Sequence, residues 1–264
     1  MSGSALRDIA WYFGNRRIDS VGDALPLYGR DEFASVTRST VPLLSLIKGG
    51  GEIWASLVRD LMNHSEGDME AHLEYQVRSP KGRGKPSHTD LMLFAGDHAV
   101  AIEGKWTEPR YPTVTEWVAC GNPDNPGNRP NVLNGWLSLI EPHAQKPLVA
   151  ADFGEAVYQS VHRAASACFS RGRPTLAYLQ FSPLPDGSAS GSHLVQDLFH
   201  LHKILGSPDA FRFVLIEVAI ERTAAFNAIA NHVQPLEVVD EVRRAIHDDR
   251  LFEFRGYRIR DLRG

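Results

Sequence analysis

The sequence predicts an α/β sandwich in which helices pack on both faces of a central mixed sheet. Three short apolar segments with alternating side chains follow one another at residues 72–78, 89–94 and 98–106, separated by a basic Gly/Pro loop and a short turn. After them, helical and strand patterns alternate along the chain. Hairpin-linked strands followed by alternating helices and strands are typical of a mixed sheet with helices on its faces.

The first part of the chain is expected to hold one helix ahead of these strands. Residues 1–50 are mixed in pattern and end at the glycine-rich break Lys48–Gly51. Residues 52–63 then place six apolar side chains on one stripe, which predicts an amphipathic helix. The strand expected over 72–78 places Leu73, Tyr75 and Val77 on one face, and Glu74, Gln76 and Arg78 on the other.

The second part of the chain is expected to add helices to both sides of the sheet and further strands to its edge. Residues 107–130 contain several Pro, Gly and Asn and predict a loop. Asp152 is expected to cap the N-terminus of a long helix. The predicted helices cover 131–140, 152–170, 193–205 and 236–247, and the predicted strands cover 174–181, 211–220 and a pair of edge strands within 251–259.

Length and composition fit one large domain with additions at its ends. The chain has 264 residues, 43% of them hydrophobic, which is enough for a substantial core. We expect an N-terminal extension over 1–50, a core over 51–220, and a C-terminal helix and strand over 221–264 packed on that core. The net charge of −4 counts against a protein that coats DNA nonspecifically, although it leaves room for a local basic surface.

The sequence also indicates a cytoplasmic protein that has no membrane partner. Its two cysteines, Cys120 and Cys168, lack the spacing of a metal site and are interpreted as reduced thiols. The first residues lack the pattern of a basic stretch followed by an apolar one. No apolar run approaches the roughly 20 residues that a membrane span requires.

The candidate functional residues lie on two of the predicted strands. Glu103 and Lys105 are two positions apart, so they point to the same face of a strand. A hairpin at residues 95–97 would bring Asp90 beside them. Two carboxylates and a lysine on apolar strands are costly to desolvate unless something compensates. A divalent metal bound by the carboxylates would provide that compensation.

This arrangement resembles the PD-(D/E)xK nuclease superfamily. The matching motif is Asp90 on the second strand, followed by Glu103-Gly104-Lys105 on the third, within a resemblance that covers roughly residues 50–181. The chain departs from the motif at Thr89, where the family has proline. The resemblance implies a restriction-endonuclease-like fold, a three-layer α/β/α sandwich with a central mixed sheet.

The resemblance also implies a chemistry, that of a metal-dependent phosphodiester hydrolase acting most often on DNA. Asp90 and Glu103 would bind Mg²⁺ or Mn²⁺, which prefer oxygen ligands, and the Gly104 carbonyl is the implied third ligand. Lys105 would orient or deprotonate the attacking water, or stabilise the charge of the pentavalent phosphate. The family often adds a carboxylate on the first helix or strand, where Glu52 and Glu74 match by position. Glu74 would hold a second metal or a metal-bound water.

Two further groups are candidate nucleic-acid contacts. Basic residues in the first hairpin loop are placed to grip phosphates beside the site. Polar residues on the helix after the third strand are placed to face the metals, as they do in members of the superfamily. An ordinary solvated surface explains either group almost as well. The candidates are Lys81, Arg83 and Lys85 in the loop, and Gln159, His162 and Arg163 on the helix.

Three alternatives remain open from the sequence. The chain is either a nuclease or a nucleic-acid-binding or scaffold module that keeps the fold without cutting. In the third alternative it is an unrelated α/β protein in which the motif is fortuitous. For the motif itself, the plain alternative is a solvated sheet face on which Glu103 and Lys105 form an ordinary surface pair. The nuclease hypothesis favours DNA over RNA as the partner and is compatible with a homodimer. Sequence specificity and the choice between endonuclease and exonuclease action are not indicated.

Overall fold

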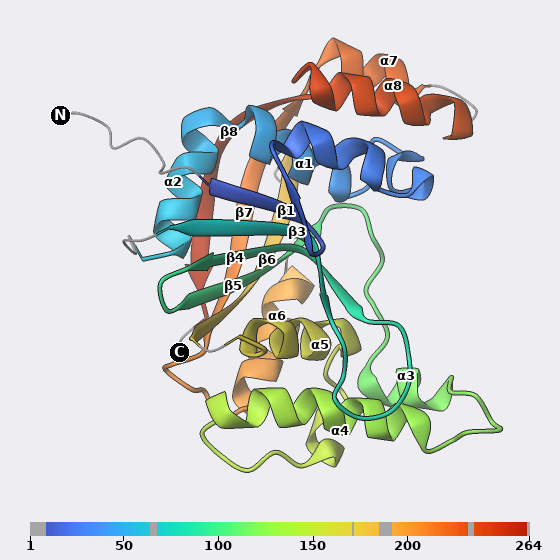
Figure 1. Ribbon diagram of the computed structural model, residues 1–264, viewed down its shortest axis with the longest axis vertical. Coiled ribbons are helices and arrows are strands. Elements are labelled where there is room, and N and C mark those ends of the chain that lie inside the picture. Colours follow the sequence, from blue (N-terminus) through green and yellow to red (C-terminus); the bar gives the residue numbers. More distant parts are fainter. Residues whose placement is uncertain (1–8, 64–67, 171, 185–191, 232–234, 263–264) are drawn as a thin grey trace.

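A mixed sheet of eight strands forms the centre of the computed structural model, which describes residues 9–63, 68–170, 172–184, 192–231 and 235–262 (Figure 1). The order of the strands across the sheet is β2-β1-β3-β4-β5-β6-β7-β8. Their bounds are β1 Ile9–Phe13, β2 Arg16–Ile18, β3 Met69–Val77, β4 Ser87–Ala95, β5 His98–Lys105, β6 Arg173–Pro183, β7 Arg212–Arg222 and β8 Phe252–Asp261.

The sheet combines an antiparallel centre with parallel neighbours. Strands β3, β4 and β5 form an antiparallel meander. Strand β6 is parallel to β5, and β7 is parallel to β6. At the two edges β2 pairs antiparallel with β1, and β8 pairs antiparallel with β7. The predicted central mixed sheet is therefore confirmed.

Helices cover both faces of the sheet and enclose a hydrophobic core on each (Figure 1). One core packs beneath α1 (Thr40–Gly49), α2 (Gly51–Leu61), α7 (Ala224–Ala230) and α8 (Pro235–His247). The other packs beneath α3 (Val114–Ala119), α4 (Asn128–Ile140), α5 (Tyr158–Cys168) and α6 (Ser192–Ile204). Short 3₁₀ helices complete the chain: η1 Val21–Leu27, η2 Arg30–Phe33, η3 Glu141–His143 and η4 Ala150–Phe153.

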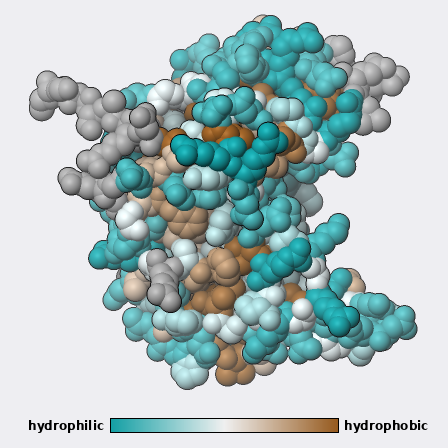
Figure 2. Space-filling model, viewed as in Figure 1, coloured by the Kyte–Doolittle hydropathy of each residue, from teal (hydrophilic) through white to brown (hydrophobic). Residues whose placement is uncertain are grey.

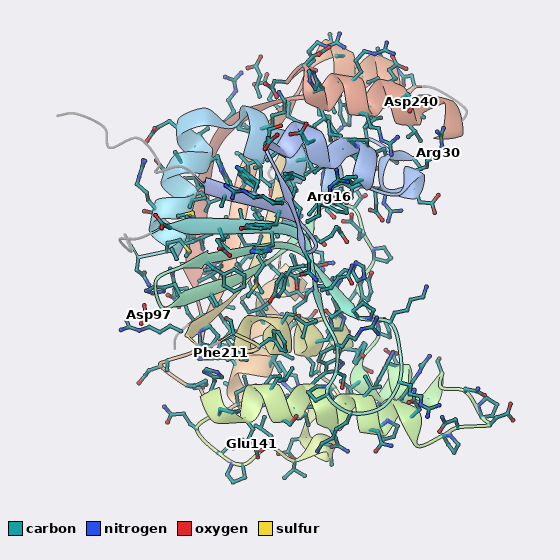
Figure 3. The ribbon with its side chains drawn as sticks, in the orientation of Figure 1. Arg16, Arg30, Asp97, Glu141, Phe211 and Asp240 are labelled. Carbon is teal, nitrogen blue, oxygen red and sulfur yellow. The ribbon has the colours of Figure 1, made fainter. Side chains whose placement is uncertain are left out.

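Side chains sort between these cores and the surface as the hydrophobic effect requires. Phe211 is fully buried between sheet and helices, whereas Glu141 and Asp240 are exposed (Figure 3). Polar residues cover most of the face seen in Figure 2, with apolar residues grouped near its middle. The predicted α/β sandwich thus has two filled interfaces between its layers.

Strand β5 alternates as predicted, whereas β3 does not. Val100 and Ile102 enter the core beneath α1 and α2, while Ala101 enters the core beneath α4 and α5. In β3, however, Leu73 packs in the first core and Val77 in the second, so the prediction that they share a face is wrong. Glu74 between them has a φ of 53°, in the left-handed region. This residue reverses the alternation of the strand.

The eight strands come from all three predicted segments of the chain. From the N-terminal segment, β1 inserts beside β3 with Ile9 opposite Met69. From the C-terminal segment, β8 forms one long strand, so the predicted pair of edge strands is wrong. Residues 1–8 lie outside the described part of the chain.

Several helices differ from their predicted bounds. Helix α5 begins at Tyr158, not at Asp152, because 150–153 form η4 and Val157 bridges to Thr113. Helix α3 occupies part of the predicted loop over 107–130 and is capped by Thr113, whose side chain accepts the Glu116 N–H. The sequence did not predict α1 or α7.

No single helix in the described residues has the length and hydropathy needed to cross a membrane. Helices α1 and α2 meet these criteria only together, and they are bent against one another by 101°.

Candidate active site

Strands β4 and β5 bring the three motif residues together on the α5 side of the sheet. Asp90 lies one residue beyond the last ladder pair, Leu91 opposite Ile102, and its Oδ2 accepts the Gly104 N–H at 2.8 Å. Lys105 Nζ lies 3.1 Å from Glu103 Oε1. Glu103 is 3% exposed and Lys105 is 8% exposed. This burial excludes the alternative of an ordinary solvated surface pair.

Gly104 permits this close approach because it has no side chain. A Cβ atom at this position would lie 3.3 Å from the Ser39 Cβ and 3.4 Å from Asp90 Oδ2. The first separation is tighter than most packed atoms adopt, and the second is at the short end of ordinary van der Waals contact. The residue between Glu103 and Lys105 is thus confined by the Asp90 carboxylate on one side and the start of α1 on the other.

Both carboxylate oxygens of Glu103 are held by side chains of the protein. Gln159 Nε2 donates to Oε1 at 2.6 Å, beside the Lys105 ammonium, and Arg163 Nε donates to Oε2. Gln159 and Arg163 are one helical turn apart on α5, so they face the same point of the sheet. Arg163 also donates to Ser87 Oγ at 2.7 Å.

Gln159 and Arg163 thus face the motif residues, as the sequence predicted, but they are buried there and offer little surface to nucleic acid. Gln159 is 4% exposed and Arg163 is 7% exposed, because both are used to pair Glu103. His162 Nδ1 lies 2.8 Å from Ser87 Oγ, and its ring packs edge-on against Tyr158. Burial and the neighbouring Arg163 charge hold the pKa of His162 well below its usual value, so the ring is neutral.

Asp90 has the opposite electrostatic setting to Glu103. Burial raises the pKa of Asp90 well above its usual value, and the negative charges of Glu103 and Glu74 raise it further. The charges of Arg163 and Lys105 offset only part of this effect. The protein therefore supplies too little positive charge to balance an ionised Asp90 carboxylate.

Glu74 lies opposite Asp90 in the β3–β4 ladder, between the pairs Leu73–Leu91 and Tyr75–Thr89. Burial raises the pKa of Glu74, although His88, whose Nδ1 lies 3.2 Å from Glu74 Oε2, lowers it in part. Its left-handed backbone conformation is uncommon outside glycine, and such strain is often found at functional sites.

The segment between β2 and α1 contributes two residues that sequence reasoning missed. Tyr28 is buried, and its pKa is raised well above the usual value by burial and then by the charges of Glu74 and Asp90. The charge of Glu32 raises the pKa of both Tyr28 and Glu74. No motif in residues 1–50 marks either residue, because their approach depends on how the segment folds back on the sheet.

Glu52, the other carboxylate suggested by the family pattern, lies away from this cluster. It is exposed on α2 and pairs with Arg59, while Ser56 Oγ donates to it at 3.1 Å. This pairing lowers the pKa of Glu52, and none of the motif carboxylates contributes to that shift. Of the two suggested positions, only Glu74 therefore reaches the site.

The basic hairpin loop is exposed and is docked on α4. Asn128 holds the loop through two hydrogen bonds, accepting the Arg83 N–H and donating to the Arg83 carbonyl, each at 2.8 Å. Lys81, Arg83 and Lys85 are exposed and form no ion pair with any described residue. Their predicted role as phosphate contacts stays a prediction that this geometry permits.

The carboxylates of Asp90, Glu103 and Glu74 are the acidic groups of this site. All are hard oxygen donors, and their mutual repulsion at Asp90 is what a bound cation would relieve. In the described part of the chain, no three His, Cys, Asp or Glu side chains are placed so that they could hold a metal ion together. To bind a metal, Glu103 would have to give up one of its hydrogen bonds from Gln159, Lys105 or Arg163.

Fold and site together define an α/β protein with a buried carboxylate–lysine centre on β4 and β5. Residues 17–213 match the family described as Domain of unknown function (DUF6946), and the chain belongs to that family. No curated protein and no solved structure matches the chain.

Proposed function

We propose that this chain is a metal-dependent phosphodiester hydrolase, a nuclease whose substrate is DNA. The observation that carries the proposal is the convergence of Asp90, Glu103 and Lys105 at the open end of the β4–β5 hairpin, away from its turn. The order of elements supports a restriction-endonuclease-like fold, since α2, the β3–β4–β5 meander, α5 and β6 follow in the order of that fold's core.

Asp90 and Glu103 are the proposed ligands of Mg²⁺ or Mn²⁺, with the Gly104 carbonyl and Glu74 beside them. A metal bound there would stabilise charge on the phosphoryl oxygens and acidify an attacking water. Arg163 and Gln159 hold the Glu103 carboxylate in place from α5. Positioning of this kind is a large part of catalysis in phosphoryl chemistry.

Lys105 acts in this proposal as a cation that orients the attacking water and stabilises the developing charge. Burial lowers the pKa of Lys105, but the interactions with Glu103, Tyr178 and Asp90, above all the Glu103 carboxylate, outweigh it, so the net pKa is raised. The ammonium donates to Glu103 and keeps further N–H groups for the substrate. Lys81, Arg83 and Lys85 are the proposed contacts to the DNA backbone.

The proposal is tested by cleavage of single-stranded, duplex and branched DNA with Mg²⁺ or Mn²⁺. We expect Asp90→Asn to abolish cleavage. We expect Lys105→Ala to lower the rate about 100- to 1,000-fold, the effect of removing one electrostatic stabiliser. Glu52→Gln, which changes a carboxylate outside the cluster, is the matched control and should cleave as the wild type does.

Cleavage that survives both substitutions, or that persists in a chelator, would contradict this function. RNA of the same sequences serves as a second substrate set, because the choice of DNA rests on the resemblance alone. Circular dichroism of each variant separates loss of chemistry from loss of fold.

A specific observation favours one alternative, a nucleic-acid-binding module that does not cut. Both oxygens of Glu103 are already paired with Gln159, Arg163 and Lys105, so this residue is satisfied without a metal. Measurable DNA affinity without divalent-metal binding by calorimetry would support the alternative. The under-compensated Asp90 favours the metal-dependent enzyme.

A further inference from the structure

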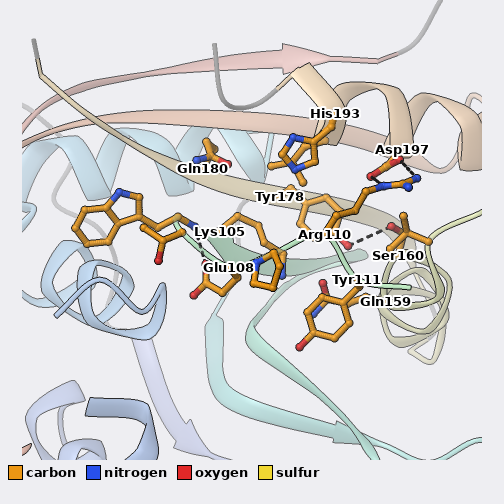
Figure 4. Close-up of a pocket in the computed structure, with 15 residues that line it drawn as sticks. Lys105, Glu108, Arg110, Tyr111, Gln159, Ser160, Tyr178, Gln180, His193 and Asp197 are labelled. Atoms are coloured by element: carbon orange, nitrogen blue, oxygen red, sulfur yellow. Dashed lines mark hydrogen bonds and ion pairs between the residues drawn. The ribbon is translucent and has the colours of Figure 1, made fainter. Parts of the chain in front are cut away.

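Lys105 also lines a cavity of about 110 Å³ (Figure 4). Its walls come from the ends of β5 and β6, the first turn of α5, the first turns of α6, and residues 106–111 after β5. Lys105 and Gln159 line this cavity and also bind the Glu103 carboxylate. The cavity therefore adjoins the motif residues.

The wall of the cavity is rich in buried polar groups. Five polar side chains that line it are less than 10% exposed: Lys105, Gln159, Ser160, Tyr178 and Gln180. The Tyr178 hydroxyl lies 3.2 Å from Ser160 Oγ, and Gln180 Nε2 donates to the Phe181 carbonyl. Buried polar groups are costly unless they have partners. A cavity lined in this way suits a ligand with several donors and acceptors.

Charges around the cavity are balanced, which argues against a free anion as the ligand. Arg110 and Asp197 point toward one another and form a two-pronged ion pair, with distances of 3.0 and 2.8 Å (Figure 4). Glu108 accepts the backbone N–H groups of Ser39 and Trp106. Lys105 is paired with Glu103. Each full charge at the wall thus has a partner in the protein.

Aromatic rings supply the remaining surface. Lys105 Nζ lies 5.0 Å from the centre of the Tyr111 ring and 5.8 Å from that of Tyr178. Tyr111 is 45% exposed, so its ring is open to a stacking partner. Neutral polar groups combined with aromatic faces are the features by which proteins hold an unstacked nucleobase.

We propose that this cavity takes one unpaired nucleobase of the substrate strand. The inference rests on the proposed nuclease function and names its substrate class: a strand that is single, or locally unpaired, where it enters the site. Tyr111 stacks on the base, and Gln180 and Ser160 bind its polar edge. A fully paired duplex cannot deliver a base to this cavity without unpairing.

The test measures binding of fluorescein-labelled DNA by anisotropy in a chelator, so that no cleavage is required. The probes are a single-stranded oligonucleotide and the same sequence as a blunt duplex. We expect the wild type to prefer the single strand. Tyr111→Ala should weaken single-strand binding about tenfold, the value of one lost base stack, whereas Tyr111→Phe should retain it.

Gln180→Leu provides a second variant, with a loss of single-strand affinity and little change for duplex. Because Gln180 is buried, circular dichroism checks whether the Gln180→Leu variant folds. If it misfolds, the test rests on Tyr111→Ala alone, because Tyr111 is exposed. Equal affinity for both probes, or single-strand binding unchanged by Tyr111→Ala, overturns the nucleobase site. Failure of the nuclease proposal is a different result: no metal-dependent cleavage while the single-strand preference persists.

Discussion

The two motif carboxylates occupy opposite electrostatic settings although they lie on neighbouring strands. Glu103 is surrounded by donors, with Gln159, Lys105 and Arg163 on its two oxygens. Asp90 accepts one backbone N–H and is repelled by Glu103 and Glu74, so its pKa is raised well above the usual value. One half of the site is neutralised by the protein, and the other half lacks charge compensation.

This difference indicates how the site is built. The α5 side chains hold Glu103 and Lys105 in fixed positions without help from a ligand. At the other half of the site, the carboxylates of Asp90 and Glu74 repel one another, and a bound cation would relieve this repulsion. Perturbed carboxylates of this kind gather at functional sites. The predictions that follow separate the two halves by substituting each in turn.

The largest effect on stability is expected at the Glu103 half of the site, where side chains of the protein neutralise the carboxylate. Arg163→Met leaves the buried Glu103 carboxylate without its main counter-charge, and we expect a loss of about 3–5 kcal/mol in the free energy of unfolding. Urea denaturation measures it. The double variant Glu103→Gln with Arg163→Met should recover part of the loss, because no buried charge is then unpaired. A loss below about 1 kcal/mol for the single variant would show that Glu103 does not depend on Arg163.

The next effect concerns the contact that joins the two halves. Gly104→Ala places a methyl group against the Ser39 Cβ and Asp90 Oδ2, and we expect a cost of roughly 1–3 kcal/mol from overpacking. Thermal and urea denaturation measure this cost. Ala101→Gly, on the opposite face of β5, is the control for a changed methyl group without a clash at Asp90. An unchanged stability for Gly104→Ala would mean that the Asp90 carboxylate is free to move away.

At the under-compensated half, Asp90→Asn should stabilise the protein in a chelator. Because the folded pKa of Asp90 is raised, its contribution to stability is present below the unfolded pKa of about 3.9 and is lost as pH rises through the folded pKa. The variant should therefore exceed the wild type by a few degrees in Tm at neutral pH, and this gap should close in acid. Added Mg²⁺ should raise the Tm of the wild type and not that of the variant.

The smallest effect is expected at Glu74, where backbone strain and charge act together. Glu74→Gly removes both and should stabilise the protein by about 1 kcal/mol, because glycine adopts a positive φ without strain. Glu74→Gln removes the charge alone and separates the two causes. If Glu74→Gly is destabilised, the left-handed conformation is not a source of strain.

Much of the sheet and the pairing of the motif residues followed from local patterns in the sequence. The alternation in β5 set Glu103 and Lys105 on one face, and the short turn after β4 returned the chain beside Asp90. The reversal at Glu74 did not follow, because nothing in the alternating pattern marks a non-glycine residue with a positive φ.

The residues that the sequence missed depend on contacts between distant parts of the chain. Helix α1 is buried around nearly its whole circumference, so it lacks the amphipathic stripe that identified α2. The sequence predicts that Arg163 faces the site and contacts nucleic acid, because its polar character gives no sign that it pairs a carboxylate 60 positions earlier. The apolar run over 41–47 was the one available signal for α1.

Calorimetric titration of Mn²⁺ into the wild type and into Asp90→Asn is the direct test of a metal site at Asp90. We expect saturable binding by the wild type and its loss in Asp90→Asn, in which the amide oxygen can still accept the Gly104 N–H. Absence of binding by the wild type, or equal binding by the two proteins, would contradict a metal site centred on Asp90.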